Sequence, residues 1–180
     1  NSEITLSIVA GGSGTVSVDW GNGVYQSVEP VSASVSAPTV VKGNTLADQA
    51  VIKIFCDNKY LTYLTCEKNE LTKLDVSQAK SLQYLRCPTN KLDSIDITKN
   101  TDLLLFYCSY NNITALDVSN NVKIADLQIG TNKISKLTGL QNLSLLRILA
   151  TMSNPLNSLD VSTNMSLQTL NARNSGLTKL

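Results

Sequence analysis

The chain contains no histidine in its 180 residues, and this limits the chemistry that it can perform. Nucleophiles of the Ser-His-Asp and Cys-His kinds need an imidazole to take up their proton, and most catalytic zinc sites use imidazole ligands. The sequence also shows no glycine-rich phosphate loop before a helix and no acidic calcium loop. It therefore predicts a protein that is not an enzyme, with no catalytic residue, no metal site and no cofactor.

Four cysteines are the next candidates for chemistry. Cys66, Cys87 and Cys108 are spaced 21 residues apart, whereas Cys56 is out of phase and is expected to cover the top of this series. Stacked units would place the three thiols about 4.8 Å apart, which fits poorly with the Cβ separation of about 3.8 Å in a disulfide. Later units carry other small or medium side chains at this position: Ile129, Thr151 and Ala172. A ladder of buried thiols that pack as small hydrophobes is favoured, with a disulfide or a metal site as open alternatives.

Carboxylates occur in two arrangements. Glu67 and Asp126 share one expected face but lie three units apart, roughly 14 Å by strand spacing, which is too far for either glycosidase geometry. A second set recurs before Ser or Thr in the repeat, namely Asp75, Asp96, Asp117 and Asp160. Regular capping of a turn explains this column better than cation binding.

Tyrosine and arginine side chains gather on the face that the first units are expected to expose. The candidate ligand-binding residues are Tyr63, Tyr84, Arg86, Leu105, Tyr107 and Tyr110. Exposed Tyr and Arg beside an apolar neighbour match the composition of interface hot spots, and tyrosine rings can also stack on sugars. The alternative stays open that these are ordinary aromatic residues of a parallel strand surface.

The elements that would position these residues follow from a repeat that fills two thirds of the chain. Six units begin at Leu61, Leu82, Leu103, Ile124, Leu146 and Leu167, spaced by 21, 21, 21, 22 and 21 residues. A unit of this size cannot bury its own apolar face, so the units must stack as a solenoid. In each unit a short strand points its second Leu and its Cys inward, and a polar Asn follows. This structural Asn ladder, whose amides are expected to bond to the backbone of neighbouring turns, comprises Asn69, Asn90, Asn111, Asn132 and Asn154.

The pattern LxxLxCxxNxLxxLDVSxN resembles the leucine-rich repeats of secreted and cell-surface proteins of Bacteroides-type bacteria. The fourth unit departs from this pattern after Ile134, and its stretch through Gly139 and Leu143 resembles the 22-residue internalin repeat with a short 3₁₀ turn. The resemblance implies a right-handed leucine-rich-repeat solenoid. It also implies a parallel β-sheet on the concave face and mostly loops or 3₁₀ turns on the convex face.

The first residues do not repeat and predict an all-β N-terminal cap over residues 1–58, followed by repeats over 59–180. Strands are expected at Ile4–Ile8, Thr15–Trp20, around Val35–Val41 and around Ala50–Cys56, with Gly11–Gly14 and Gly21–Gly23 as turns. The stretch Val18–Gly23 is similar to a strand and turn of PKD-type β-sandwich modules, and Trp20 is expected in the cap core. No C-terminal cap follows Leu180, so the natural chain continues, the last unit caps itself, or a second copy packs there.

Charge and the pattern of the termini limit the partners. The chain carries 15 basic and 14 acidic residues, which gives no electrostatic case for nucleic acid, and no apolar run reaches the roughly 20 residues of a membrane helix. Asn1 without a leader suggests a removed targeting segment or a start inside a longer chain, so any membrane anchor would lie outside this chain. We expect a secreted or cell-surface module, with an outer-membrane lipoprotein as one form of it, that binds a protein through the concave sheet. A carbohydrate-binding module and a structural spacer are the alternatives.

Overall fold

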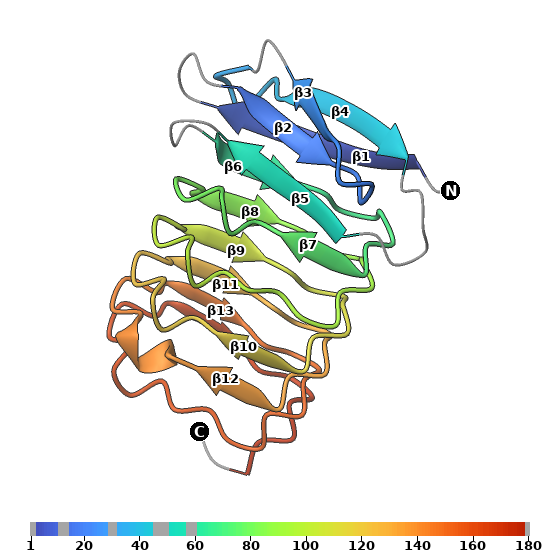
Figure 1. Cartoon of the computed structure of the whole chain (residues 1–180). Coiled ribbons are helices and arrows are strands. Elements are labelled where there is room, and N and C mark those ends of the chain that lie inside the picture. Colours follow the sequence, from blue (N-terminus) through green and yellow to red (C-terminus); the bar gives the residue numbers. More distant parts are fainter. Residues whose placement is uncertain (1–2, 11–14, 29–31, 45–50, 57–60, 179–180) are drawn as a thin grey trace.

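The repeat region forms a leucine-rich-repeat solenoid whose stacked turns are visible in Figure 1. The computed structural model describes residues 3–10, 15–28, 32–44, 51–56 and 61–178. One short strand of each unit lies in the concave sheet: β6 (Leu61–Thr65), β8 (Tyr84–Arg86), β9 (Leu105–Tyr107), β11 (Asp126–Gln128), β13 (Ile148–Ala150) and β14 (Thr169–Asn171). These strands pair in parallel, and the register keeps equivalent residues of successive units side by side. The predicted fold class is confirmed.

The opposite wall of the solenoid contains strands as well as turns. β7 (Lys73–Asp75) pairs with β5 (Val51–Cys56) of the cap, and β10 (Ala115–Asp117) pairs with β12 (Lys136–Thr138). The 3₁₀ turn η2 (Leu140–Asn142) follows β12, where the fourth unit was expected to carry it. Gly139 precedes η2 with a φ of 87°, and a Cβ there would lie 2.3 Å from the backbone of Ser119. The extra residue of this unit is therefore accommodated by a glycine turn that only glycine fits.

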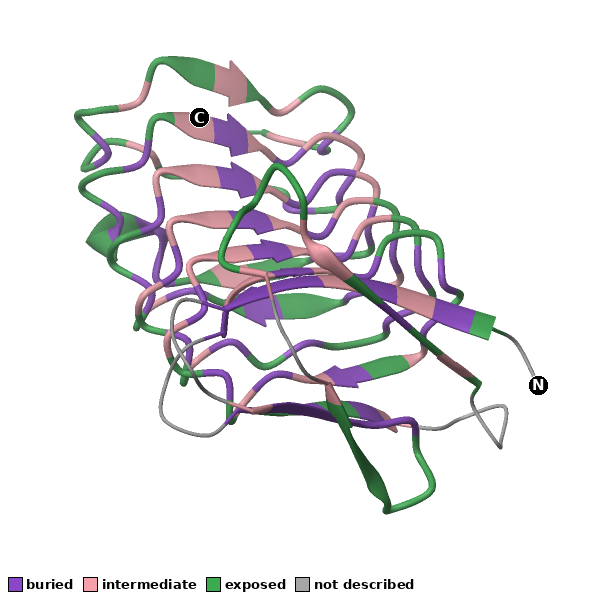
Figure 2. Ribbon diagram, turned by 90° about the horizontal axis from the view of Figure 1, so that it is seen from above, coloured by how far each residue is buried: buried purple, intermediate pink, exposed green. Residues whose placement is uncertain are grey.

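The hydrophobic core fills the space between the two walls. Figure 2 shows buried and partly buried positions alternating along the concave strands. Leu64, Leu85 and Phe106 occupy one inward position on successive strands and are fully buried. Leu74 and Val76 close the core from the opposite wall. The core is therefore continuous along the axis, because each unit completes the apolar layer of its neighbour.

The structure places the Asn ladder directly after the concave strands. The Asn111 amide nitrogen donates to the carbonyl oxygens of Cys87 and Cys108 at 3.0 and 3.1 Å, and its oxygen accepts from the Leu92 N–H at 3.0 Å. Asn90 and Asn132 make the same kind of contacts one unit to either side. Each buried amide thus joins adjacent turns, and these bonds offset the cost of removing it from water.

A second ladder of buried asparagines runs on the opposite side of the core and was not predicted. Asn100, Asn121 and Asn164 donate to pairs of carbonyl oxygens of the preceding turn at 2.8 to 3.0 Å. Asn100 bonds to Val76 and Ala79, for example. Where both ladders are present, they bond both sides of a turn to its neighbour; the second ladder is interrupted in the fourth unit, which carries Leu143 at this position.

One residue in each unit adopts a left-handed backbone conformation just before the first Asn ladder. These residues have φ between 55° and 59°: Lys68, Thr89, Tyr110, Thr131, Ser153 and Asn174. A β-branched side chain is strained in this conformation, whereas asparagine tolerates it, as Asn174 does in the last unit.

The left-handed position makes Thr131→Asn a stabilising substitution. We expect it to raise the free energy of unfolding by about 1 kcal/mol, because it relieves backbone strain without altering the backbone bonds of residue 131. Urea denaturation would measure the change. Thr114→Asn, at an exposed threonine without a positive φ, is the matched control and should leave stability within about 0.5 kcal/mol. A loss of stability in Thr131→Asn would contradict the strain argument.

The described cap strands extend both walls of the solenoid. β1 (Glu3–Ala10) pairs antiparallel with β6 and with β4 (Thr39–Asn44), which continues the concave sheet to eight strands. β2 (Val16–Asp19) lies between β3 (Tyr25–Val28) and β5 in the other sheet. Thr5 of β1 exchanges two hydrogen bonds with Asn69, so the cap also completes the first rung of the Asn ladder.

Trp20 is buried between the two cap sheets. Its ring packs on Gly43 of β4, where a Cβ would lie 2.1 Å from the indole, and its Nε1 donates to Gln26 at 2.8 Å. The preceding Asp19 accepts from three backbone N–H groups of the Gly21–Gly23 turn, in which both glycines have positive φ. This turn and the core position of Trp20 agree with the sequence analysis.

One expected strand of the cap differs from the structure, and three other expected features lie outside the described residues. The strand expected at Val35–Val41 begins only at Thr39, and Val35 lies in a turn, because Pro38 has no N–H and is favoured at the start of a strand rather than within it. The Gly11–Gly14 connection, the boundary between residues 58 and 59, and Leu180 all lie outside the described residues.

Candidate functional site

The structure brings five of the six candidate ligand-binding residues together on the first three parallel strands. Tyr63 pairs in register with Tyr84, and Tyr84 with Leu105, while Arg86 pairs with Tyr107 in the neighbouring column. All five side chains are partly buried. We call these five residues, Tyr63, Tyr84, Arg86, Leu105 and Tyr107, the aromatic patch. It lies on an extended, hydrogen-bonded sheet, so its backbone geometry is held rigidly.

The two tyrosine rings at one side of the patch contact each other. The ring centroids of Tyr63 and Tyr84 lie 6.4 Å apart at an interplanar angle of 45°. Such a tilted pair presents two ring faces in different directions. Leu105 continues this column on β9 and adds an aliphatic surface. This side of the patch is suited to apolar contact.

The other side of the patch is polar and centres on Tyr107. The Arg86 guanidinium carbon lies 5.2 Å from the centroid of the Tyr107 ring, a cation–π contact. The Tyr107 hydroxyl donates to Asp126 Oδ2 at 2.5 Å, and Gln128 Nε2 donates to Asp126 Oδ1 at 3.2 Å. Tyr107 is therefore held from both sides, by a cation over its ring and by a carboxylate at its hydroxyl.

The Tyr107 hydroxyl should titrate abnormally. The pKa of Tyr107 is raised from 10.0 to about 12, and burial is the largest cause. The hydrogen bond to Asp126 and the negative charge of Asp126 raise it further, whereas the charge of Arg86 lowers it. Because the folded pKa lies above the ordinary value, the neutral hydroxyl stabilises the fold below pH 10. That contribution is lost as the pH rises through about 12.

An ultraviolet titration of tyrosinate would test this assignment. We expect one tyrosine to ionise at about 12, and Tyr107→Phe to remove that transition. Asp126→Asn should move the transition partway toward the ordinary pKa, because burial would remain while the negative charge is removed. An unchanged transition in Asp126→Asn would show that the carboxylate does not act on Tyr107.

Tyr110 and the partners of Tyr107 show where sequence reasoning was incomplete. Tyr110 lies beyond the end of β9 at the left-handed turn position and is 54% exposed, so it belongs to the rim rather than to the strand surface. Asp126 and Gln128 were not predicted as members of the site. Their register with Leu105 and Tyr107 on the adjacent strand was the available signal, since diagonal neighbours on parallel strands are within reach of long side chains.

The cysteine ladder lies inside the solenoid and away from this surface. Cys66, Cys87 and Cys108 are fully buried free thiols, and the sulfurs of Cys87 and Cys108 lie 3.1 Å apart. Burial raises the pKa of the Cys66 and Cys87 thiols well above the ordinary value, which opposes thiolate formation. Cys56 lies on β5 in the opposite wall, where its sulfur accepts from the Leu61 N–H at 3.3 Å. The series therefore packs as small apolar side chains.

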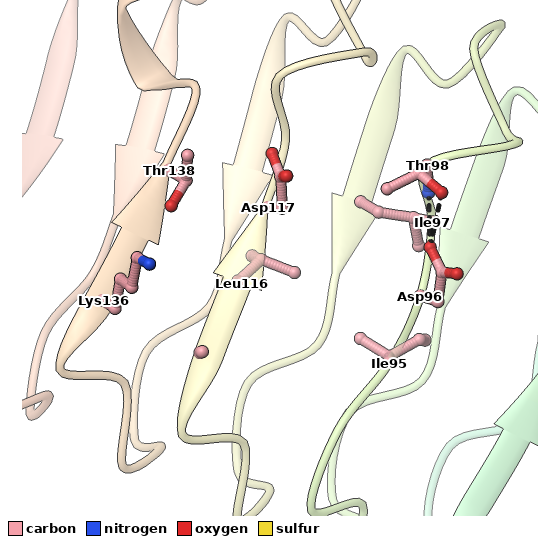
Figure 3. A pocket seen from close by; sticks show the side chains of 9 residues that line it. Ile95, Asp96, Ile97, Thr98, Leu116, Asp117, Lys136 and Thr138 are labelled. Carbon is pink, nitrogen blue, oxygen red and sulfur yellow. Dashed lines mark hydrogen bonds between the residues drawn. The ribbon is translucent and has the colours of Figure 1, made fainter.

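A pocket of about 380 Å³ opens on the opposite wall beside β10 and β12. Figure 3 shows that its polar side chains are Asp96, Thr98, Asp117, Lys136 and Thr138. Asp96 Oδ1 accepts from the backbone N–H and the hydroxyl of Thr98 at 2.9 and 2.7 Å, and these bonds lower the pKa of Asp96. The hydrogen bonds of Ser119 likewise lower the pKa of Asp117. The carboxylates thus cap turns, as the sequence predicted, and the pocket adjoins a wall segment, residues 94–97, that forms no strand.

The described residues offer neither a metal site nor a membrane-spanning helix. Within the part of the chain that the structure describes, no group of three or more Cys, Asp or Glu side chains is placed to hold a metal ion. No helix in the described ranges combines the length and the apolar character needed to cross a membrane. The aromatic patch is therefore the candidate site that the geometry supports best.

The chain is similar to solved structures but to no family model or curated protein. No protein-family model matches the chain, and no curated protein matches it. Among solved structures, the chain is similar to the functional domain of InlJ from Listeria monocytogenes, which is described as including a cysteine ladder. The two are 31% identical over 61% of this chain and 34% of that chain, with a TM-score of 0.43. The chain thus spans about a third of the length of that structure.

Proposed function

We propose that the chain is a protein-binding module that holds a segment of a partner protein against the aromatic patch. The observation that carries this proposal is the gathering of Tyr63, Tyr84, Arg86, Leu105 and Tyr107 on three adjacent, rigid strands. Tyr and Arg are the residues most enriched at interface hot spots, where a preorganised surface limits the entropy lost on binding. Tyr110 on the rim extends the contact surface.

The proposed setting is outside the cell or on its surface. The support is the resemblance of the repeat to those of secreted and surface proteins. Localisation of the native, full-length protein in intact cells would test this setting, since a protease added outside the cells should remove only an exposed domain.

Selection from a displayed random-peptide library would test the binding role. Peptides enriched on the wild-type protein should lose about 2 kcal/mol of binding free energy on Tyr84→Ala, the size of effect seen at interface hot spots. Thr169→Ala is the matched control, because Thr169 occupies the same column on β14, well away from the patch, and should change binding little. Enrichment that survives Tyr84→Ala unchanged, or the absence of enriched peptides, would overturn the proposal.

Carbohydrate binding is the second candidate, because the tilted rings of Tyr63 and Tyr84 expose faces on which sugars can stack. A glycan array distinguishes the two. Glycan binding that is lost on Tyr84→Ala, without peptide enrichment, would favour this candidate over a protein partner.

A further inference from the structure

Arg86 carries a charge that no carboxylate of the described residues neutralises. Its Nε is buried and finds no hydrogen-bond acceptor among the described residues. The salt bridges of the described residues all join other side chains: Lys42 with Glu3, Lys53 with Asp19, Lys91 with Glu70 and Lys123 with Asp102. The Nε is enclosed by the protein, so a partner would reach the guanidinium through its two terminal nitrogens, which are not among the buried polar atoms that lack a partner in the described residues.

The nearby carboxylate of Asp126 is prevented from serving as that acceptor. Asp126 lies on β11, two strands from Arg86 on β8, which is roughly 10 Å by strand spacing. The Tyr107 side chain lies between them, with its ring under the guanidinium and its hydroxyl on the Asp126 carboxylate. Gln128 Nε2 donates a hydrogen bond to Oδ1 of the same carboxylate, so both oxygens of Asp126 already have a partner. The cation and the anion are thus held apart on one surface.

We propose that Arg86 binds a carboxylate on the partner, so that the partner segment is acidic and carries an apolar side chain beside its acidic residue. This inference rests on the proposed function and specifies its partner. The two terminal nitrogens of the guanidinium match a carboxylate with two parallel hydrogen bonds, and the guanidinium carbon lies 5.2 Å from the centroid of the Tyr107 ring. The apolar neighbour contacts Tyr84 and Leu105, which adjoin Arg86 on β8 and β9.

Asp126 sets the orientation of this segment. Its negative charge disfavours a second anionic group over β11, so the acidic residue lies over β8 and a neutral or basic residue lies over β11. The same charge disfavours a dianionic phosphate more than a single carboxylate. The patch therefore favours a partner segment with a singly charged acidic residue, and it binds this segment in one direction along the sheet axis.

Two blocked dipeptides that differ only in charge would test the inference. Acetyl-Phe-Glu-amide and acetyl-Phe-Gln-amide would be titrated into the ¹⁵N-labelled protein while the Arg86 Nε–Hε resonance is followed. We expect the Glu peptide to bind about tenfold more tightly than the Gln peptide and to shift that resonance. Arg86→Gln should abolish the preference, and Arg86→Lys should retain only part of it, because an ammonium keeps the charge but lacks the fork. Unchanged backbone resonances away from the patch would show that these variants fold.

The outcomes separate this inference from the proposed function. Equal binding of the two dipeptides, or a preference that persists in Arg86→Gln, would overturn the carboxylate assignment even if library peptides still depend on Tyr84. Failure of both dipeptides to shift the Arg86 resonance would overturn it as well. Loss of library enrichment would instead remove the proposed function itself.

Discussion

Replacing Asn111 by alanine is expected to lower the free energy of unfolding by about 3 kcal/mol. The substitution leaves the buried Leu92 N–H without its acceptor, which costs about 1–3 kcal/mol, and removes two donors from the carbonyls of Cys87 and Cys108. The lost hydrogen bonds join the second unit to the third, and the stability of a solenoid depends on such contacts between neighbouring units. Chemical denaturation followed by circular dichroism would measure it, and a weaker central interface should also broaden the transition.

Two further variants test the physical reason for this loss. Asn120→Ala removes an exposed amide with one long hydrogen bond of 3.4 Å and should cost less than about 0.5 kcal/mol. Asn111→Ser should recover part of the loss, because Ser175 occupies the ladder position of the last unit and donates to Thr151 at 3.0 Å. If Asn111→Ala were as mild as Asn120→Ala, the ladder would not be a source of stability.

Truncation of Phe106 to alanine is the second substitution with a large expected effect. Phe106 is fully buried on β9 at the position where neighbouring units carry Leu64, Leu85, Leu127 and Leu149. Its loss leaves a cavity in a core that adjacent turns share, and we expect a cost of about 3–5 kcal/mol. Thermal and urea denaturation would measure this change.

Phe106→Leu is the matched variant, because it restores the side chain of the neighbouring units. Here we expect a cost below about 1.5 kcal/mol, with the remaining deficit due to the difference in volume. The patch lies on the other face of β9, so peptide binding should survive in Phe106→Leu. Equal destabilisation by both substitutions would show that this site demands an aromatic ring and that the units are not interchangeable.

The fold was predictable because the inward-facing apolar positions recur in all six units, even where single positions of the pattern change. Repetition of Leu, Cys and Asn at constant spacing identifies which side chains point inward, and the observed register of Tyr63 with Tyr84 and Leu105 follows from it. The second Asn ladder was within reach of the same argument, since Asn100 and Asn121 are also 21 residues apart. The strands of the opposite wall were not, because three residues are too short to show an alternating pattern.

The site was predictable only as a set of columns. The sequence places Tyr107 beside Gln128 and near Asp126, but side-chain rotamers decide that the Tyr107 hydroxyl reaches Asp126 while Arg86 lies over its ring. The unpaired state of Arg86 depends on this arrangement. A periodic pattern reports which face a residue occupies, and it carries no information on which neighbour that residue contacts.

The antiparallel placement of β1 has a consequence for self-assembly. A solenoid whose terminal coil exposed a parallel strand would offer the next molecule a template on which to continue the repeat, and such head-to-tail contacts produce filaments. Here β1 runs antiparallel to both β6 and β4, so the edge strand β4 has the direction of the repeat strands but is separated from them by a reversed strand and does not share their 21-residue spacing. A second copy that paired with β4 would therefore not continue the stacking of the repeats, and we expect the cap to disfavour head-to-tail polymerisation at that end.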